Sequence, residues 1–536
     1  MVMTTIAASQ IGGFPLQLTV LLFVPFAVIT LFAALLTGSI GDEVGEFYLG
    51  DRELTPLRHG LAMCGDYLSA ATLLGSTGLV ALTGYDGILY LVGTVVAWLL
   101  VLLVIAQPLR NAGGFTFGDT LALRLPNGHR SVRIALAACT LTVSVLYLVA
   151  QLVGSVALLS QFVGVPGSLS RATCVIAIGT LVILFVAVGG MLGTTFIQVV
   201  KAVMLVVGVA VTAIMVMTHY HWNVNTLLGG AVHGSGLGNT FLHPGLRFGG
   251  SISNKLDFIS LEIAIVLGLA ALPHLMMRLL APRRSSVLHR SLLWTIGLVG
   301  FVCLAAAVLG LGAVGIVGRD TITRTSPSGD AAVLLLAQSM GGAILTALIT
   351  CLAFVTLLAV AAGLTLAAAS SLAHDVYAEV VCKGQATAQK ELAVARFAAF
   401  VIGALGILLA LVAWSFNPAT LAFLAFAIAA SAILPTIVYS LFWRKFSATG
   451  ALLSLYGGLS CSILLVVFSP VVSSTPGSIF PSADFAWFPL NNPGLVSVPA
   501  GFLLGWLGTV LGSSKDTETN AETYDQFEVR SLIGAD

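Results

Sequence analysis

The sequence predicts an all-α integral membrane protein with about thirteen transmembrane helices. The composition, the length of the apolar runs and the placement of the charged residues lead to this prediction. Of the 536 residues, 58% are hydrophobic and only 8% are charged, whereas soluble domains carry about 25% charged residues. Separate apolar runs of about 20 residues suit helices rather than barrel strands. The composition therefore excludes a soluble protein, and no basic cluster indicates nucleic-acid binding.

Thirteen apolar segments mark the predicted spans. They are residues 16–38, 59–83, 87–107, 134–161, 171–190, 194–217, 258–280, 291–317, 340–373, 393–415, 418–443, 448–469 and 495–512. We interpret the first as a retained span, because residues 1–15 lack the Lys or Arg with which a signal peptide begins. The ninth is longer than a bilayer requires, so we expect it to tilt or to continue beyond the membrane.

The distribution of Lys and Arg predicts the orientation of the chain. With the N-terminus outside, 18 of the 23 basic residues fall in inner loops or at inner helix ends, and five fall on the outer side. Cytoplasmic loops of membrane proteins are enriched in Lys and Arg. We therefore expect a multi-pass protein of the cell membrane with an outer N-terminus and a cytoplasmic C-terminus.

Two of the predicted spans are candidates for interrupted helices. Segment 59–83 contains Gly60, Gly65, Gly75 and Gly78, and segment 258–280 contains Gly268 and Pro273. These segments open two blocks of five spans, and an odd number of spans inverts the second block relative to the first. Interrupted helices at matching positions of inverted halves point to a transporter's binding site. The alternatives are a packing seam of small residues in the first segment and a plain proline kink in the second.

This pattern divides the chain into units. We expect an N-terminal peripheral helix with an inner loop, a first five-helix repeat, an outer loop that folds over the outer surface, a second five-helix repeat, two C-terminal peripheral helices, and a polar, mobile cytoplasmic tail. Their residues are 1–58, 59–217, 218–257, 258–443, 444–512 and 513–536, in that order.

Ionisable and polar residues inside the spans are the first candidates for function, because charge is costly there. They are Asp66, Gln198, Lys201, Glu262, His274 and Arg278. For Arg278 we favour the interpretation that the side chain reaches the inner headgroups, and for Lys201 this interpretation competes with a functional role. We interpret His274 as a hydrogen-bonded packing residue and Glu262 as a residue of the outer mouth.

The absence of three sequence motifs argues against catalysis and against ATP as the energy source. The chain contains no GxxxxGK[ST], HExxH or GxSxG sequence, which are the signatures of P-loops, zinc proteases and serine hydrolases. The seven cysteines show no CxxC spacing, and we interpret them as reduced packing residues. We therefore expect a protein that is not an enzyme, with no cofactor except a possible bound sodium ion.

Several stretches together resemble the sodium/solute symporter family, in its cation/acetate symporter branch. They are EFYLGDREL (46–54), GDYLSAATLLG (65–75), GYDGILYLVG (84–93), GGFTFGDTLALRL (113–125), GGMLGTTFIQVVKAVML (189–205), ALPHLMMRLLAP (271–282), LAVAAGLTLAAASSLAHDVY (358–377) and VRSLIG (529–534). They occur in order along nearly the whole chain. The resemblance implies the LeuT-type core of two inverted five-helix repeats and symport of acetate and similar short monocarboxylates by alternating access.

The resemblance also implies a cation site between the second and ninth segments. The family's sodium ligands fall at Gly65, Leu68, Thr356, Ala359 and Val360. Here the chain departs from the family pattern, because two hydroxyl-bearing positions are Ala and Val. An acidic residue that often supports this site falls at Gln198, and Lys201 stands one turn further on. Either sodium binds through Thr356, Ser69 or other oxygens, or protons are the coupling ion with Asp66 or Lys201 as the titrating group.

The substrate pocket is expected on the second, third and seventh segments. The positions that bind larger substrates in the family fall at Ala71, Thr72, Leu91, Thr94, Ile265 and Gly268, and we add His274, which follows the proline. This small, mostly apolar set suits a two- or three-carbon acid, whose carboxylate can meet a half-helix N-terminus. The expected partners are a monocarboxylate, a coupling cation and lipid. The alternatives are a symporter for an amino acid or pantothenate, and a sensor or channel on the same fold.

Overall fold

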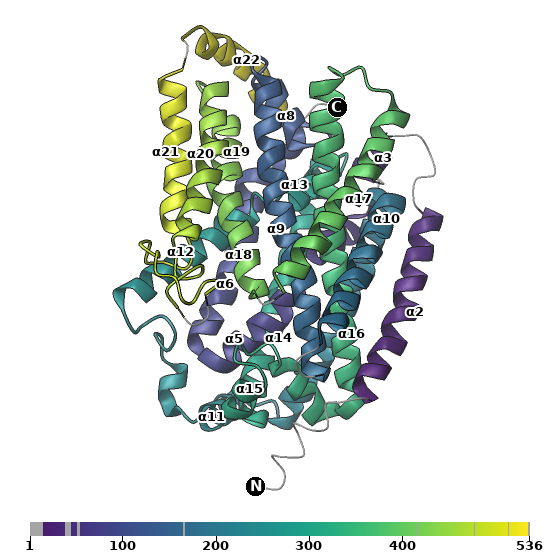
Figure 1. The fold of residues 1–536 in the computed structure, drawn as a ribbon, viewed down its shortest axis with the longest axis vertical. Helices are drawn as coiled ribbons and strands as arrows, with labels where there is room; N and C mark the ends of the chain where they lie inside the picture. The colour runs from purple at the N-terminus through teal and green to yellow at the C-terminus, as the bar shows by residue number, and fades with distance from the viewer. Residues whose placement is uncertain are drawn as a thin grey trace.

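The computed structural model describes residues 14–37, 44–50, 54–163, 167–414, 416–475, 478–512 and 514–533. Within these ranges the chain is helical, and its one extended pairing is an isolated bridge between Ser473 and Phe480. Most of the helices run side by side, with the ends of α11 and α22 on opposite faces (Figure 1). We use α11 (Val224–Ser235) and α22 (Ser514–Ile533) to name these two faces.

The first half of the chain contains the predicted first repeat. Its helices are α2 (Phe14–Thr37), α3 (Val44–Leu49), α4 (Pro56–Tyr67), η1 (Ala71–Gly75), α5 (Ser76–Thr83), α6 (Tyr85–Leu100), η2 (Val101–Ile105), α7 (Ala106–Ala112), α8 (Phe117–Arg124), α9 (His129–Val163), α10 (Ser168–His219) and, after α11, η3 (Gly238–Leu242). The predicted outer loop, residues 218–257, is thus partly helical. It is tied to α6 by Asp86, whose carboxylate accepts the N–H groups of Gly245, Arg247 and Phe248 at 2.8–3.2 Å.

The second half contains the predicted second repeat and the C-terminal helices. They are α12 (Ile252–Leu269), α13 (Pro273–Leu280), α14 (Ser285–Val317), α15 (Arg319–Thr325), α16 (Ala332–Ser370), η4 (Ser371–Val381), α17 (Ala388–Val412), α18 (Pro418–Ile428), η5 (Ala429–Ile433), α19 (Leu434–Phe442), α20 (Ala448–Val467) and α21 (Gly494–Val510). The long ninth segment continues as η4 to Val381, and the expectation that it tilts or continues beyond the membrane stays a prediction.

Ten helices of the described residues are long and apolar enough to cross a membrane. One of them is α10 with 52 residues, which bends at Gly190, where φ is 49° and a Cβ atom would contact Phe47. It therefore holds two of the predicted segments, 171–190 and 194–217. Two shorter apolar helices, Thr72–Thr83 and Gly494–Val510, lie in further predicted segments. The multi-pass arrangement is confirmed, and the total of thirteen crossings stays a prediction.

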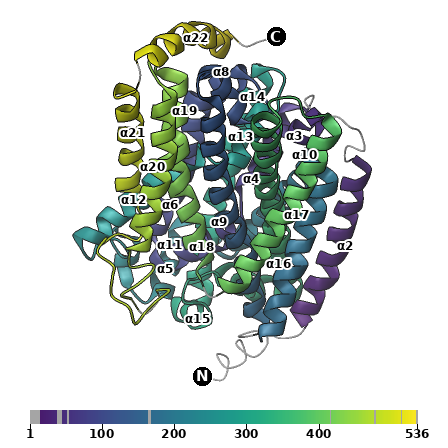
Figure 2. The ribbon, with the colours of Figure 1, turned by 45° about the horizontal axis from the view of Figure 1, so that its top comes forward.

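The tail differs from the expectation of a mobile polar segment. Residues 514–533 form α22, which lies across the ends of α8 and α19 (Figure 2). Its Tyr524 and Phe527 are buried, and the Tyr524 hydroxyl donates to the Leu441 carbonyl at 3.1 Å. The Arg124 guanidinium covers the Tyr524 ring at 4.8 Å. The tail is polar on average, so its composition did not reveal the role of these two aromatic residues. They stand at i and i+3, share one face of α22, and pack that helix against the bundle.

Candidate functional site

The break in the first interrupted helix lies where the glycines predicted it. α4 begins after the N-cap Thr55 with Pro56 at its first turn and ends at Tyr67. Leu68 then takes an extended conformation with ψ of 104°, and its N–H returns to the Cys64 carbonyl at 2.9 Å. Backbone that leaves the helix at this depth is tolerated only where protein surrounds it. Leu68 is fully buried, so this condition is met.

The second half of this segment restarts through two hydroxyls. The Ser69 Oγ accepts the Thr72 N–H at 3.2 Å, the Thr72 Oγ1 accepts the Ser69 N–H at 3.3 Å, and the two hydroxyls lie 3.2 Å apart. This reciprocal arrangement satisfies N–H groups that a helix start leaves unpaired. Both residues therefore serve the restart of the helix, in addition to any role toward a ligand.

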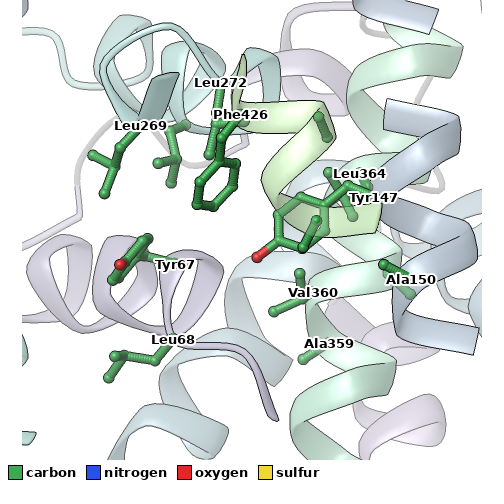
Figure 3. Packing of buried hydrophobic residues seen from close by; sticks show 14 of the residues in the cluster. Tyr67, Leu68, Tyr147, Ala150, Leu269, Leu272, Ala359, Val360, Leu364 and Phe426 are labelled. Atoms are coloured by element: carbon green, nitrogen blue, oxygen red, sulfur yellow. The ribbon is translucent and has the colours of Figure 1, made fainter. Parts of the chain in front are cut away.

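The seventh segment is also broken, as its glycine and proline predicted. α12 ends at Leu269, Leu272 is extended with ψ of 124°, and α13 starts at Pro273. Proline is favoured at this first helical position because its missing N–H is not needed there. The residues at both breaks, Leu68 with Leu269 and Leu272, border the same buried region of the core (Figure 3). The two interrupted helices thus meet, as the inverted-repeat argument required.

A buried charged cluster joins these two helices to α10. The Asp66 carboxylate of α4 forms an ion pair with Arg278 of α13 through Nε. Its other oxygen accepts the Gln198 side-chain N–H of α10 at 2.6 Å. The Lys201 ammonium donates to the Gly65 carbonyl. We call Asp66, Gln198, Lys201 and Arg278 the core cluster, which holds one carboxylate and two basic groups.

Two interpretations of the basic residues are corrected by these contacts. Arg278 was expected to reach the headgroups, yet it is 2% exposed, pairs with Asp66 and donates to the Thr195 hydroxyl. Lys201 is 0% exposed, which excludes the alternative that it reaches the membrane surface. The sequence showed how far each residue lies along its helix. It did not show that both helices pack against the broken segment, which gives the side chains polar partners inside the protein.

Two other ionisable residues, His274 and Glu262, have buried polar atoms without a hydrogen-bond partner among the described residues. His274 was expected to be hydrogen bonded, but neither ring nitrogen has a partner among the described residues, and its ring lies 6.0 Å from that of Tyr147. Glu262 lies in the second half of α12, beside Gly93, where a Cβ atom would collide with the carboxylate. Its Oε1 is buried without a partner in the described chain.

The five positions of the expected cation site lie close together, but two of their oxygens are already bonded. The Gly65 carbonyl accepts from Lys201, and the Ala359 carbonyl accepts from Gln198 at 2.7 Å. Leu68, Ala359 and Val360 appear together in Figure 3. Thr356 is buried, and its hydroxyl has no hydrogen-bond partner among the described residues.

The expected substrate positions surround the breaks. Leu91, Thr94, Ile265 and Gly268 are buried, and the Thr94 hydroxyl accepts from the Tyr67 hydroxyl at 3.0 Å. The side chain of Ala71 lies outside the described atoms. Together with Thr72 and His274, these positions lie on η1, α6, α12 and α13.

Three aromatic residues line this region in the structure, and two of them, Tyr147 and Phe426, were not singled out from the sequence. Tyr67, Tyr147 and Phe426 surround the same region, and the Tyr147 hydroxyl points toward the break in the first interrupted helix (Figure 3). The rings of Tyr147 and Phe426 meet edge to face at 5.5 Å. A tyrosine inside an otherwise apolar span was the available signal for Tyr147, because a buried hydroxyl needs a polar partner.

Comparisons with known proteins agree with this geometry. The family model for the sodium:solute symporter family matches residues 47–458. The chain belongs to this family. It is 41% identical over 98% of its length to a monocarboxylic acid transporter of Corynebacterium glutamicum, of which 97% is covered. It is 38% identical over 96% of its length to the uncharacterised symporter YwcA of Bacillus subtilis, of which 98% is covered.

Solved structures show the fold of this symporter. A substrate-bound, outward-open Na+-coupled sialic acid symporter matches with a TM-score of 0.71 at 13% identity, over 94% of this chain and 98% of that one. MhsT in complex with L-phenylalanine matches with a TM-score of 0.51 at 15% identity, over 84% of this chain and 98% of that one. The family prediction and the LeuT-type fold are confirmed. The protein is a multi-pass membrane symporter rather than a member of an enzyme family.

Proposed function

We propose that this symporter takes up acetate and similar short-chain monocarboxylates together with a cation, by alternating access across the cell membrane. The observation that carries the proposal is the meeting of two interrupted helices at a core cluster with one carboxylate and two basic groups. A monocarboxylate adds the anion that such a cluster can balance. The apolar surroundings, which include Ile265, Val360 and Phe426, suit a short alkyl chain.

The aromatic residues supply the remaining recognition. The Tyr147 hydroxyl can donate to the carboxylate, and so can the N–H groups at the start of α13, where the helix dipole favours an anion. Tyr67 and Phe426 cover the region and limit the size of the substrate. A symporter for pantothenate or a polar amino acid would need more polar side chains than these positions offer. The relative from Corynebacterium glutamicum supports the acid, and no described feature favours a sensor or a channel.

The coupling ion in this proposal is the proton, carried by Lys201. Two of the oxygens that the family uses for sodium are already held by N–H donors, at Gly65 and Ala359. Asp66 is ion paired with Arg278, so its protonation would break that pair. Lys201 donates to a neutral carbonyl, so it can release its proton without separating opposite charges. Sodium is the alternative, supported by the family and by the Thr356 hydroxyl, which has no hydrogen-bond partner within the described part of the chain.

Proton loss at Lys201 has a direct structural consequence. Gly65 lies three residues before the break, and a Cβ atom there would meet the Gln198 backbone, so α4 and α10 touch at this point. The neutral amine loses a charge-assisted hydrogen bond to the Gly65 carbonyl. The contact between the end of α4 and α10 therefore weakens when the proton leaves, which links protonation to the position of the interrupted helix.

The topology belongs to the proposal as well. We place the N-terminus outside and α22 in the cytoplasm, following the Lys and Arg distribution. The division into a first repeat (59–217), an outer loop (218–257) and a second repeat (258–443) is kept on the same grounds, because the two interrupted helices open the two repeats.

The test is uptake of radiolabelled acetate into proteoliposomes, with sodium and pH gradients imposed separately at fixed membrane potential. We expect accumulation when the proton gradient is directed inward, with the exterior more acidic than the interior. The uptake must exceed that of protein-free liposomes, because acetic acid crosses lipid unaided. Lys201→Gln should abolish this accumulation, whereas Lys445→Gln, at an exposed lysine, should leave it unchanged. Accumulation driven by sodium alone would contradict the proton assignment. No protein-dependent uptake under either gradient would overturn the monocarboxylate assignment.

A further inference from the structure

A second buried charged network lies between the candidate site and the α22 face. Its centre is Arg133 of α9, whose guanidinium donates to Asp119 at 2.7 Å and to Asp375 at 2.8 Å. Asp375 also accepts the Thr116 hydroxyl at 2.6 Å and the Ser371 hydroxyl at 3.0 Å. These bonds join α8 and α9 of the first repeat to η4 of the second.

The network extends through a histidine. The ring nitrogens of His374 lie 3.0 Å from Asp119 and 2.8 Å from Glu391 of α17. Its ring also meets the rings of Tyr48 and Phe115 edge to face, at 5.7 and 5.3 Å. We call the whole set the α8–η4 network: Thr116, Asp119, Arg133, Ser371, His374, Asp375, Glu379 and Glu391.

Two cavities are lined in part by different residues of this network. A small cavity of about 30 Å³ is lined by Pro273, Met276 and Met277 of α13 together with Asp375. A wider cavity of about 370 Å³ is lined by Leu49 and Gly114 together with the network's Asp119, His374 and Glu379. The first cavity begins where the second interrupted helix restarts. The network therefore separates the candidate site from the wider cavity.

The contact between α8 and η4 is tight at this separation. A Cβ atom on Gly118 of α8 would collide with the Asp375 carboxylate and would lie 3.2 Å from the Arg133 guanidinium. Burial alone would raise the pKa of Asp119, but hydrogen bonds from His374 and Arg133 hold it below its usual range. Asp119 therefore stays ionised, and the ion pairs hold α8 against η4.

We propose that the α8–η4 network is the gate that closes the substrate path between the candidate site and the α22 face. The gate opens when α8 separates from η4, which requires Arg133 to release Asp119 or Asp375. The direct bonds from α8 to η4, between Thr116 and Asp375 and between Asp119 and His374, must break as well. This inference rests on the proposed function, because a release path has meaning only in a transporter. Its test, however, reads out accessibility and needs no substrate.

The experiment places a cysteine behind the gate. Met276→Cys introduces a thiol into the lining of the small cavity. A membrane-impermeant maleimide is then added to inverted membrane vesicles, which present the α22 face to the reagent. The chain with Met276 intact gives the background of the native cysteines. We expect Asp375→Asn and Gly118→Ala, which weaken the gate by charge removal and by steric collision, each to raise the labelling rate of the new cysteine about tenfold.

The controls separate the gate from general damage. Gly297→Ala changes a glycine of α14 at which a Cβ atom meets nothing within 4 Å, and it should leave the rate unchanged. Thr116→Val removes the hydrogen bond to Asp375 and the side-chain cap of α8, but it keeps every charge, so a smaller rise of about threefold is expected. This milder variant decides the question if the others do not reach the membrane.

Each outcome has one meaning for the gate. Unchanged labelling in Asp375→Asn and Gly118→Ala, or in Thr116→Val where only that variant is made, would overturn the proposal. The network would then be a structural staple only. Increased labelling in the gate variants, together with no acetate transport by the unsubstituted protein, would support the gate and reject the proposed substrate, so the two proposals can fail separately.

Discussion

Asp66→Asn is the sharpest test of the core cluster. The substitution keeps the size of the side chain and its hydrogen bond with Gln198, but it removes the only carboxylate that pairs with Arg278 within the described chain. Arg278 is then a charged group, 2% exposed, without an ionic partner. Removing one member of a buried ion pair costs about 3–5 kcal/mol. We expect about 3 kcal/mol, because the Thr195 hydroxyl still accepts from the guanidinium.

The free energy of unfolding in detergent micelles measures this effect. The double variant Asp66→Asn with Arg278→Gln should be more stable than Asp66→Asn by about 1 kcal/mol or more, because it removes the unpaired charge. The exposed pair Arg444–Asp525, at 2.7 Å and more than half exposed on both sides, is the matched control. Its Asp525→Asn variant should lose less than about 1 kcal/mol. An equally small loss for Asp66→Asn would refute the burial and pairing of Arg278 described here.

Two further predictions concern the aromatic residues. Tyr147→Phe keeps the ring that packs on Phe426 but removes the hydroxyl, so the KM for acetate should rise about three- to tenfold, since one hydrogen bond contributes about 1 kcal/mol; an unchanged KM would show that the hydroxyl does not bind substrate. Tyr524→Ala removes a buried ring and its bond to Leu441, so α22 should become sensitive to proteolysis and the protein should lose about 3 kcal/mol of stability. Protection equal to that of the parent protein would contradict the docking of α22.

The sequence predicted the interrupted helices well, because their causes are local. Glycine lowers helix propensity and proline removes a backbone hydrogen bond wherever they stand in a span. The breaks at Leu68 and Leu272 follow directly from these residues. The expected ligand positions of the second and ninth segments also lie together in the structure, although their roles remain predictions.

The charged residues were predicted less well. Arg278 was expected to reach the inner lipid headgroups, and the tail that forms α22 was expected to be mobile. Arg133 and Asp119 were not singled out, although they form the centre of the α8–η4 network. For both arginines a deciding partner lies far away in the sequence: Asp66 is 212 residues from Arg278, and Asp375 is 242 residues from Arg133.

The sequence by itself determined the membrane environment, the helical class, the positions of the two breaks and the family, because hydropathy, glycine, proline and short motifs act over a few neighbouring residues. Only the tertiary structure decided which buried charges meet, which carbonyls are occupied, and where the path toward the α22 face is closed. Burial of a charge is costly unless an opposite charge or a hydrogen-bond partner reaches it. Whether a partner reaches it depends on how helices from the two repeats pack together, and no local pattern of residues carries that information.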